Sequence, residues 1–159
     1  MYANRGMYAE EMVNRTIDYL SNKNCLIEKR NIPIKIVKDL NNNMIVGKLL
    51  CKSTVDYCGF VNNRHIEFEV KQTNQTNFHV DLIKPHQYAY LIKASQCNCM
   101  AFVIVHFSLC DEFYLLSIQW IDQYLVKYNK KTIKYEDIKK ECQLISIIYP
   151  GILNLIEKI

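Results

Sequence analysis

The first twenty residues carry an apolar stripe with the period of a helix. Its spacing of i, i+3 and i+4 is that of a helix with one face against a core, and its members are Ala9, Met12, Val13, Thr16, Ile17 and Leu20. Glu10 lies beside this stripe rather than within it. We therefore predict an amphipathic helix that begins near Gly6, with Glu10 at the edge of its buried face.

The chain then changes to the alternation that is typical of strands. Residues 34–38 alternate after Pro33, asparagines interrupt the pattern at 41–43, and residues 44–50 resume an extended apolar pattern. This segment is either a hairpin or a protrusion from the domain. A second hairpin is predicted over residues 55–70, because the pair Asn62-Asn63 tolerates the positive φ angles of a type I′ turn.

The second half of the chain alternates strands with helices. Residues 100–107 form a continuous apolar run of the kind buried on both faces, and a further strand is predicted at 113–116. Pro85 opens one predicted helix, and others are predicted over 117–128, 136–142 and 152–159. This order indicates an α/β fold with a central mixed sheet flanked by helices. At 159 residues, the chain fits a single domain over 1–159.

The hairpin around Asn62-Asn63 brings four polar residues to one face. With a two-residue turn, residues pair when their numbers sum to 125, so Asp56 falls opposite Glu69 and Thr54 falls opposite Lys71. Because side chains alternate along a strand, all four emerge on the same side of the sheet. The opposite side, which should cover the core, receives Val55, Tyr57, Ile66, Phe68 and Val70.

Two opposed carboxylates favour a metal site on this face. Directly paired residues hold their Cβ atoms about 4.5–5.5 Å apart, and like charges in that position destabilise a sheet. A divalent cation between Asp56 and Glu69 removes the repulsion, and carboxylate oxygens suit Mg²⁺. Lys71 lies roughly 7 Å beyond Glu69, from where its ammonium can reach a phosphate or an attacking water. The alternative is an ordinary half-exposed strand, in which charged and apolar residues also alternate.

The composition places only weak limits on the binding partners and on the cellular location of the protein. A net charge of +4 tolerates nucleic acid as a partner but does not require it. Seven scattered cysteines provide neither a disulfide framework nor zinc-site spacing. The longest apolar stretch, residues 100–105, is too short to span a membrane, and the N-terminus lacks the apolar run of a secretory signal. We expect a cytoplasmic protein with no membrane partner.

Several separated motifs, in order, resemble the RecU-type Holliday junction resolvases, a family within the PD-(D/E)xK, restriction-endonuclease-like nuclease superfamily. The resemblance covers roughly residues 4–120. The matching stretches are Asn4-Arg5-Gly6-Met7-Tyr8-Ala9-Glu10-Glu11, Pro33-Ile34-Lys35-Ile36-Val37, Ser53-Thr54-Val55-Asp56-Tyr57-Cys58-Gly59, Ile66-Glu67-Phe68-Glu69-Val70-Lys71-Gln72-Thr73, Phe78-His79, His86-Gln87, Phe102-Val103-Ile104 and Asp111-Glu112-Phe113-Tyr114-Leu115-Leu116.

The resemblance implies a role for each residue of the polar face. Asp56, Glu69 and Lys71 would be catalytic, with Lys71 stabilising the pentacovalent phosphate. Glu10 would have a supporting role on the first helix. Mg²⁺, with Mn²⁺ as a substitute, would be held by Thr54, Asp56, Glu69 and Gln87.

The resemblance also implies how the protein meets DNA. The family acts as homodimers that nick four-way junctions symmetrically in recombination and repair, and a recombinase is a further expected partner. A β-stalk enters the junction centre in the family, whereas here a shorter insertion, about residues 39–52, is available. The candidate DNA contacts are Arg5, Lys48, Lys52 and His86.

Three functions therefore remain open at the level of sequence. The leading hypothesis is a Mg²⁺-dependent junction resolvase. The second keeps the fold but makes the protein a restriction- or repair-type nuclease on duplex or branched DNA, as the shorter insertion allows. The third is a DNA-bridging protein that binds without cutting, against which the intact set of Asp56, Glu69 and Lys71 argues.

Overall fold

The fold is built on one mixed six-stranded sheet. The computed structural model describes residues 7–21, 23, 25–40, 44–51 and 54–159. The sheet order is β1-β4-β5-β7-β8-β10, and β5 and β7 pair in parallel while the other neighbours are antiparallel. The strands are β1 (Cys25–Lys29), β4 (Tyr57–Val61), β5 (Arg64–Thr73), β7 (Met100–Phe107), β8 (Glu112–Ser117) and β10 (Gln143–Ile145). The predicted mixed sheet is confirmed.

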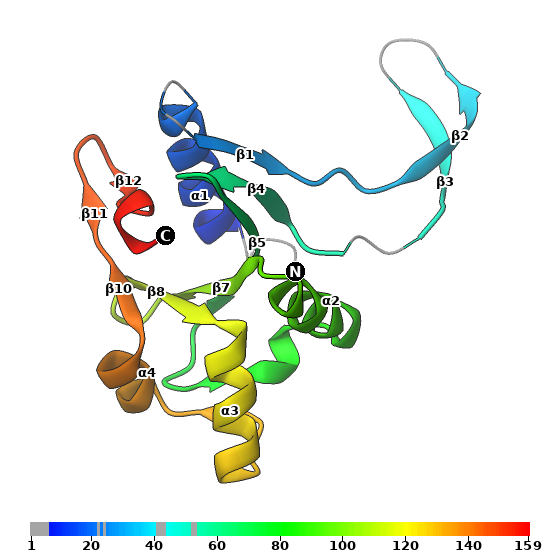
Figure 1. Cartoon of the computed structure of the whole chain (residues 1–159). Coiled ribbons are helices and arrows are strands. Elements are labelled where there is room, and N and C mark those ends of the chain that lie inside the picture. The colour runs from blue at the N-terminus through cyan, green and yellow to red at the C-terminus, as the bar shows by residue number, and fades with distance from the viewer. Residues whose placement is uncertain (1–6, 22, 24, 41–43, 52–53) are drawn as a thin grey trace.

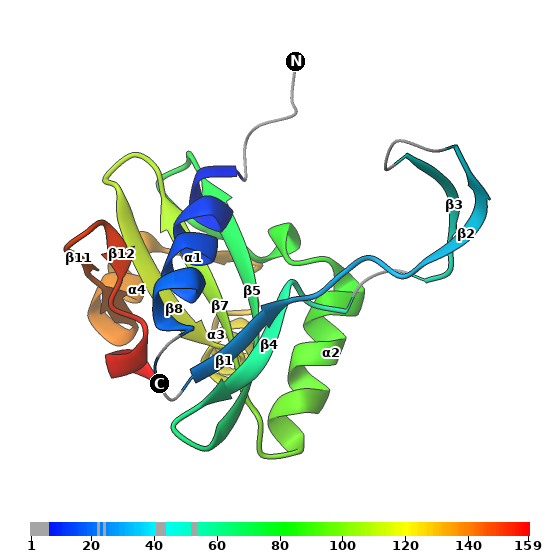
Figure 2. The same ribbon diagram turned by 90° about the horizontal axis from the view of Figure 1, so that it is seen from above.

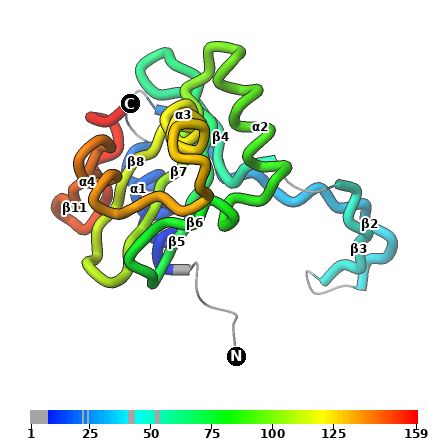
Figure 3. The backbone as a smooth tube through the Cα atoms, turned by 90° about the horizontal axis from the view of Figure 1, so that it is seen from below, coloured from blue at the N-terminus to red at the C-terminus, as the bar shows by residue number. Residues whose placement is uncertain are grey.

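Helices cover both faces of this sheet (Figure 2). On one face lies α1 (Met7–Leu20), whose stripe residues Ala9, Met12 and Val13 are buried in a shared core with β5. On the other lie α2 (Pro85–Gln96) and α3 (Ile118–Tyr128), which bury Leu91 and Ile121 against β7. Figure 3, seen from below, shows α3 in front of the sheet with α4 (Tyr135–Glu141) to one side. Each predicted helix up to residue 142 is confirmed within a residue or two of its predicted bounds.

The short elements complete these layers. They are β6 (Phe78–His79), the 3-10 helix η1 (Val80–Leu82), β9 (Thr132–Ile133), β11 (Ile147–Ile148), β12 (Ile152–Leu153) and the 3-10 helix η2 (Ile156–Lys158). The helix predicted over 152–159 is therefore wrong. Ile152 and Leu153 are buried beside α1, and the Leu153 amide donates to Thr16 Oγ1 at 2.9 Å, which holds this segment extended. Tertiary contact overrides the helical pattern of these residues.

The hairpin of β4 and β5 has the predicted register. Asn62 and Asn63 have φ angles of 49° and 63°, as a type I′ turn requires. Tyr57 pairs with Phe68, so the numbers of paired residues sum to 125 as predicted. However, the β4–β5 ladder begins only at Tyr57, so the predicted pairing of Thr54 with Lys71 is not part of it. Val55 also differs from expectation. It packs with the α2 side of the sheet, because the chain has left the strand and no longer alternates with Tyr57.

A two-stranded arm projects from the domain (Figure 1). It consists of β2 (Ile34–Asp39) and β3 (Ile45–Leu49), and every residue of both strands is exposed. We call this hairpin the stalk. It begins at Ile34, earlier in the chain than the predicted insertion at 39–52, because residues 34–38 form its outgoing strand instead of a strand of the main sheet. The segment is thus both a hairpin and a protrusion.

No helix among the described residues is long and apolar enough to cross a membrane.

Gly59 is where β1 approaches β4 most closely. A Cβ built at this position would lie 2.0 Å from the carbonyl oxygen of Leu26 and 2.7 Å from Cα of Ile27, both backbone atoms that cannot rotate away. We expect Gly59→Ala to lower the free energy of unfolding by about 1–3 kcal/mol or more, the cost of overpacking a fitted interior. Urea unfolding measures this change. Glu28→Ala, at an exposed position of β1, is the control, and equal stability of both variants would contradict the close approach.

Candidate active site

One buried carboxylate, that of Glu69, organises the predicted polar face. Glu69 lies in the middle of β5 on the side that faces α2, and it is fully buried. Its Oε1 accepts hydrogen bonds from Lys71 Nζ at 2.5 Å and from Gln87 Nε2 at 2.6 Å. Its Oε2 accepts from the backbone amide of Asp56 at 3.1 Å. The structure therefore brings Asp56, Glu69, Lys71 and Gln87 together.

Each partner comes from a different local structure. Lys71 follows Glu69 by two residues on the same strand, so both side chains emerge on one face. Asp56 precedes β4 and is set opposite Glu69 by the hairpin turn. Gln87 is in the first turn of α2, where Pro85 opens the helix and the Gln87 Oε1 accepts from the Lys84 amide at 3.1 Å. That bond fixes the Gln87 side chain and leaves its NH₂ directed at Glu69.

Burial determines the protonation of Glu69. Desolvation raises the pKa of this carboxyl, the Lys71 ammonium opposes the shift and the nearby Asp56 adds to it, which together bring the pKa to about 7. A carboxyl that changes charge near neutral pH can release its proton when a cation arrives. Perturbed carboxyls of this kind are concentrated at functional sites.

The pKa of Glu69 predicts how metal-free stability depends on pH. The native state keeps this proton up to pH about 7, whereas an ordinary glutamate loses it near 4.5. Between these values the native state binds more protons than the unfolded chain, so the free energy of unfolding should fall as pH rises. Urea unfolding in EDTA across this range measures the effect. In Glu69→Gln this part of the pH dependence should vanish, and identical profiles for the two proteins would contradict the assignment.

An open cleft lies beside Asp56, with a volume of about 590 Å³. Among the predicted residues, Glu10, Asp56, His86 and Gln87 line it. Its cationic lining residues are Lys29, Arg30 and Lys84, of which Lys29 Nζ bonds Glu10 Oε2 at 2.7 Å. Glu10 therefore lies in the same cleft as Asp56 and is held there by Lys29.

Other predicted residues lie apart from Glu69. Thr54 Oγ1 accepts from Arg30 Nη1 at 2.6 Å, so its hydroxyl is held by the arginine. Lys48 is exposed on the stalk. Arg5 and Lys52 lie outside the described residues.

The sequence patterns also missed three residues. Glu67, Arg30 and Tyr90 form a hydrogen-bonded group next to Thr54. Glu67 precedes Glu69 by two residues on the same face of β5, and this spacing is the one signal that pointed to it. Its burial depends on α2, which lies far along the chain.

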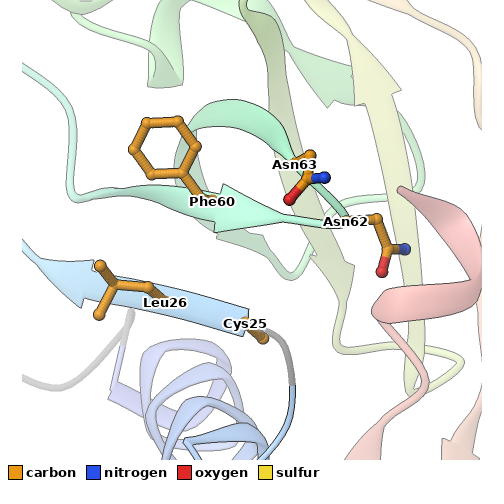
Figure 4. A pocket seen from close by; sticks show the side chains of 5 residues that line it. All are labelled: Cys25, Leu26, Phe60, Asn62 and Asn63. Atoms are coloured by element: carbon orange, nitrogen blue, oxygen red, sulfur yellow. The ribbon is translucent and has the colours of Figure 1, made fainter.

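A second hollow, shown in Figure 4, lacks the residues of a nuclease site. It lies at the far end of β1 and β4 and is lined by Cys25, Leu26, Phe60, Asn62 and Asn63. None of these five side chains is a carboxylate or a lysine, which phosphodiester hydrolysis on a metal would need.

The donor set beside the cleft fits a hard divalent cation. Magnesium is typically held by one or two carboxylates and keeps several waters. The backbone amide of Asp56 bonds the Glu69 carboxylate, which places the two acidic residues side by side, and the cleft lined by Asp56 leaves room for waters and a phosphate. No cluster of three or more His, Cys, Asp or Glu side chains suited to a metal occurs within the described part of the chain, so a zinc-type cage is not present there.

Comparison with known proteins assigns the family. Residues 4–159 match the family model described as RecU, Recombination protein U. The chain belongs to the RecU family. A RecU relative from Ureaplasma parvum serovar 3 is 32% identical over 152 residues, which are 95% of this chain and 89% of the relative. One from Bacillus cereus (strain B4264) is 35% identical over 158 residues, 93% of this chain and 79% of the relative. Both are named Holliday junction resolvase RecU.

A solved structure supports the fold of this RecU chain. It is that of Hjc from Archaeoglobus fulgidus, described as a Holliday junction resolvase from an archaeal hyperthermophile. The two structures align with a TM-score of 0.52 at 11% identity, covering 86% of this chain and 91% of the other. The restriction-endonuclease-like fold is therefore confirmed. Membership of a family of resolvases further supports a requirement for a divalent metal ion.

Proposed function

We propose that this protein is a Mg²⁺-dependent endonuclease that resolves Holliday junctions by paired, symmetric nicks. The observation that carries the proposal is the convergence of Asp56, Lys71 and Gln87 on the buried carboxylate of Glu69, at the edge of an open cleft. Family membership and the names of the relatives supply the substrate, a four-way or branched DNA.

The two carboxylates would hold the metal, with Thr54 and Gln87 as further ligands. Mg²⁺ suits this oxygen-rich set, and Mn²⁺ should substitute for it. When bound, such an ion lowers the pKa of a water molecule and neutralises charge on the scissile phosphate. The Gln87 NH₂ donates to Glu69, so ligation through its oxygen would require the amide to turn and to give up the bond that Oε1 accepts from the Lys84 amide.

Lys71 has two tasks in this proposal. Its Nζ lies 2.5 Å from Glu69 Oε1 and favours the ionised form that a metal needs. With a metal sharing that carboxylate, the ammonium is free to donate to the phosphate, where negative charge grows as the water attacks. Lys71 is mostly buried, so its charge acts with little screening by solvent.

The cleft and the stalk would bind the DNA around this centre. Lys84 and His86 lie at the start of α2 along the cleft and can contact backbone phosphates. Lys48 and the apolar stalk would occupy the open centre of the junction. A homodimer places two such sites on a substrate with two-fold symmetry, so that each protomer cuts one strand. A recombinase is a further partner that we propose on the strength of the family.

The test compares substrates and metals. A labelled four-way junction, with a matched linear duplex beside it, is incubated with Mg²⁺, with Mn²⁺ or with EDTA, and the nicks are mapped. We expect nicks on the junction alone, symmetric across it and dependent on metal. Equal cleavage of the linear duplex would instead support a restriction- or repair-type nuclease. Junction binding without cleavage under any metal would support a DNA-bridging protein.

A further inference from the structure

Arg30, Glu67 and Tyr90 form a hydrogen-bonded group that we call the Arg30 network. Arg30 Nη2 donates to Glu67 Oε1 at 2.5 Å and to the Tyr90 hydroxyl at 3.0 Å, and that hydroxyl donates to the same Oε1 at 2.9 Å. The guanidinium also lies over the Tyr90 ring, 5.3 Å from its centroid. Glu67 is 2% exposed and Tyr90 extends from α2, so the network ties β5 to the helix that carries Gln87.

Two further contacts of Arg30 reach the segment that carries two proposed metal ligands. Arg30 Nη1 donates to Thr54 Oγ1 at 2.6 Å. The backbone amide of Arg30 donates to the carbonyl oxygen of Asp56 at 2.7 Å. Residues 54–56 lie before β4 and outside its ladder, so strand pairing does not fix them. Arg30 therefore supplies, from side chain and backbone, contacts that hold both Thr54 and Asp56, of which Asp56 bonds Glu69.

Arg30 also lies at the base of the stalk. It follows β1 and precedes β2, and residues 54–56 are the return path from β3 to β4 (Figure 1). Both legs of the stalk thus meet at Arg30. These two hydrogen bonds tie the start of the outgoing leg to the end of the returning leg.

The charge of Glu67 makes this arrangement compatible with a cation site. An arginine beside a divalent metal would repel it, and a carboxylate in direct contact offsets that charge. Glu67 provides this contact from a buried position, where an unpaired carboxylate would be costly. Its other oxygen, Oε2, is buried without a hydrogen-bond partner among the described residues. His65 Nε2 lies 3.6 Å from Oε1 and is charged only when protonated, so the nearer and always charged Arg30 is the principal counter-ion of Glu67.

We infer that Arg30, seated by Glu67 and Tyr90, is a positioning residue that sets Thr54 and Asp56 for metal binding at the base of the stalk. The inference rests on the proposed function, because it concerns the same metal site. Neither Glu67 nor Tyr90 touches substrate in this account. They act through Arg30, and Arg30 acts through the two ligands.

The test measures the metal dependence of single-turnover junction cleavage in Arg30→Lys and Tyr90→Phe. Outer partners of metal ligands typically change metal affinity by about 10- to 100-fold, so we expect the Mg²⁺ concentration for half-maximal cleavage to rise by that factor in Arg30→Lys. Tyr90→Phe should show a smaller rise. At saturating Mg²⁺ both should approach the wild-type rate, and junction binding in EDTA should match wild type.

Matched controls are Arg64→Lys, an exposed arginine at the start of β5, and Tyr128→Phe, an exposed tyrosine at the end of α3. Both should keep the wild-type metal dependence. If Arg30→Lys fails to fold, Tyr90→Phe carries the test, since it removes one hydroxyl and keeps the ring.

Two results would overturn the inference about Arg30 and leave the proposed nuclease function intact. In one, wild type and both variants need the same Mg²⁺ concentration. In the other, junction binding in EDTA weakens in step with cleavage, which makes Arg30 a direct DNA contact. A wild-type protein that cleaves no junction with any divalent metal would overturn the proposed function, and the inference with it.

Discussion

Lys71→Met is expected to slow junction cleavage by roughly 10²–10³-fold at saturating Mg²⁺, the usual cost of removing one preorganised charge from a developing oxyanion. The ammonium lies 2.5 Å from Glu69 Oε1 and is mostly buried, so a water cannot replace it at the same place. Junction binding in EDTA should be nearly unchanged, because a single buried lysine contributes little to the DNA surface. Single-turnover cleavage under saturating enzyme measures the chemical step.

This experiment distinguishes the two proposed tasks of Lys71, which are to keep Glu69 ionised and to donate to the phosphate. If it only keeps Glu69 ionised, raising the pH or the Mg²⁺ concentration should restore the rate of Lys71→Met, because ionisation and metal binding are linked. We predict that neither change restores the rate. Lys93→Met, at an exposed lysine in the last turn of α2, is the matched control and should cleave as wild type. Full rescue at high pH would contradict a direct role at the phosphate.

Removal of the stalk is expected to abolish preference for the junction without unfolding the protein. Every residue of β2 and β3 is exposed, including large apolar residues such as Val37 at 67%, so the stalk contributes nothing to either core. An exposed apolar surface on a rigid hairpin is typical of a recognition element. Replacing residues 34–49 by a short Gly-Ser linker should weaken junction binding by about tenfold or more, equivalent to about 1.4 kcal/mol.

The stalk experiment needs two readouts. Urea unfolding should show a stability close to that of wild type, and competition between junction and linear duplex should show the lost preference. Leu109→Ser, at an apolar residue that is 67% exposed in the turn between β7 and β8, is the control for losing exposed apolar surface outside the stalk. Retained preference for the junction would contradict the role of the stalk.

The sequence predicted the centre of the site because local rules determine it. Asn62 and Asn63 adopt the positive φ angles of a tight turn, and a tight turn fixes the register of the strands it joins. Glu69 and Lys71 then share a face by strand alternation alone. Asp56 falls opposite Glu69 even though it precedes the ladder, since it comes directly before Tyr57, which forms the first pair with Phe68.

Elements set by distant contacts could not be predicted in this way. β1 has a single buried residue, Ile27, so its sequence carries no alternation to detect. The extended segment at Ile152 and Leu153 depends on Thr16, which lies more than a hundred positions earlier in the chain. Val55 packs on the α2 face of the sheet and not on the predicted α1 face, because residues 54–56 leave β4 toward the stalk.

The Arg30 network illustrates the same limit at the site. Glu67 looks like an exposed charge of a half-buried strand, and its burial becomes visible only when α2 is placed over it. Arg30 is separated from Glu67 by the whole stalk in sequence. The sequence pattern can therefore locate the face that carries Glu69 and Lys71, whereas the residues that pack around this face are identified only in the folded structure.

The central claim is that Asp56 and Glu69 hold the metal that drives cleavage, and one measurement tests it most directly. The protein is first bound to a labelled four-way junction in EDTA, Mg²⁺ is then added in excess, and strand nicks are followed in time for wild type, Asp56→Asn and the exposed control Asp18→Asn. We predict nicks in wild type and in the control only after Mg²⁺ is added, while Asp56→Asn stays bound to an intact junction. Nicking by Asp56→Asn at the wild-type rate, or nicking by wild type in EDTA, would contradict the account.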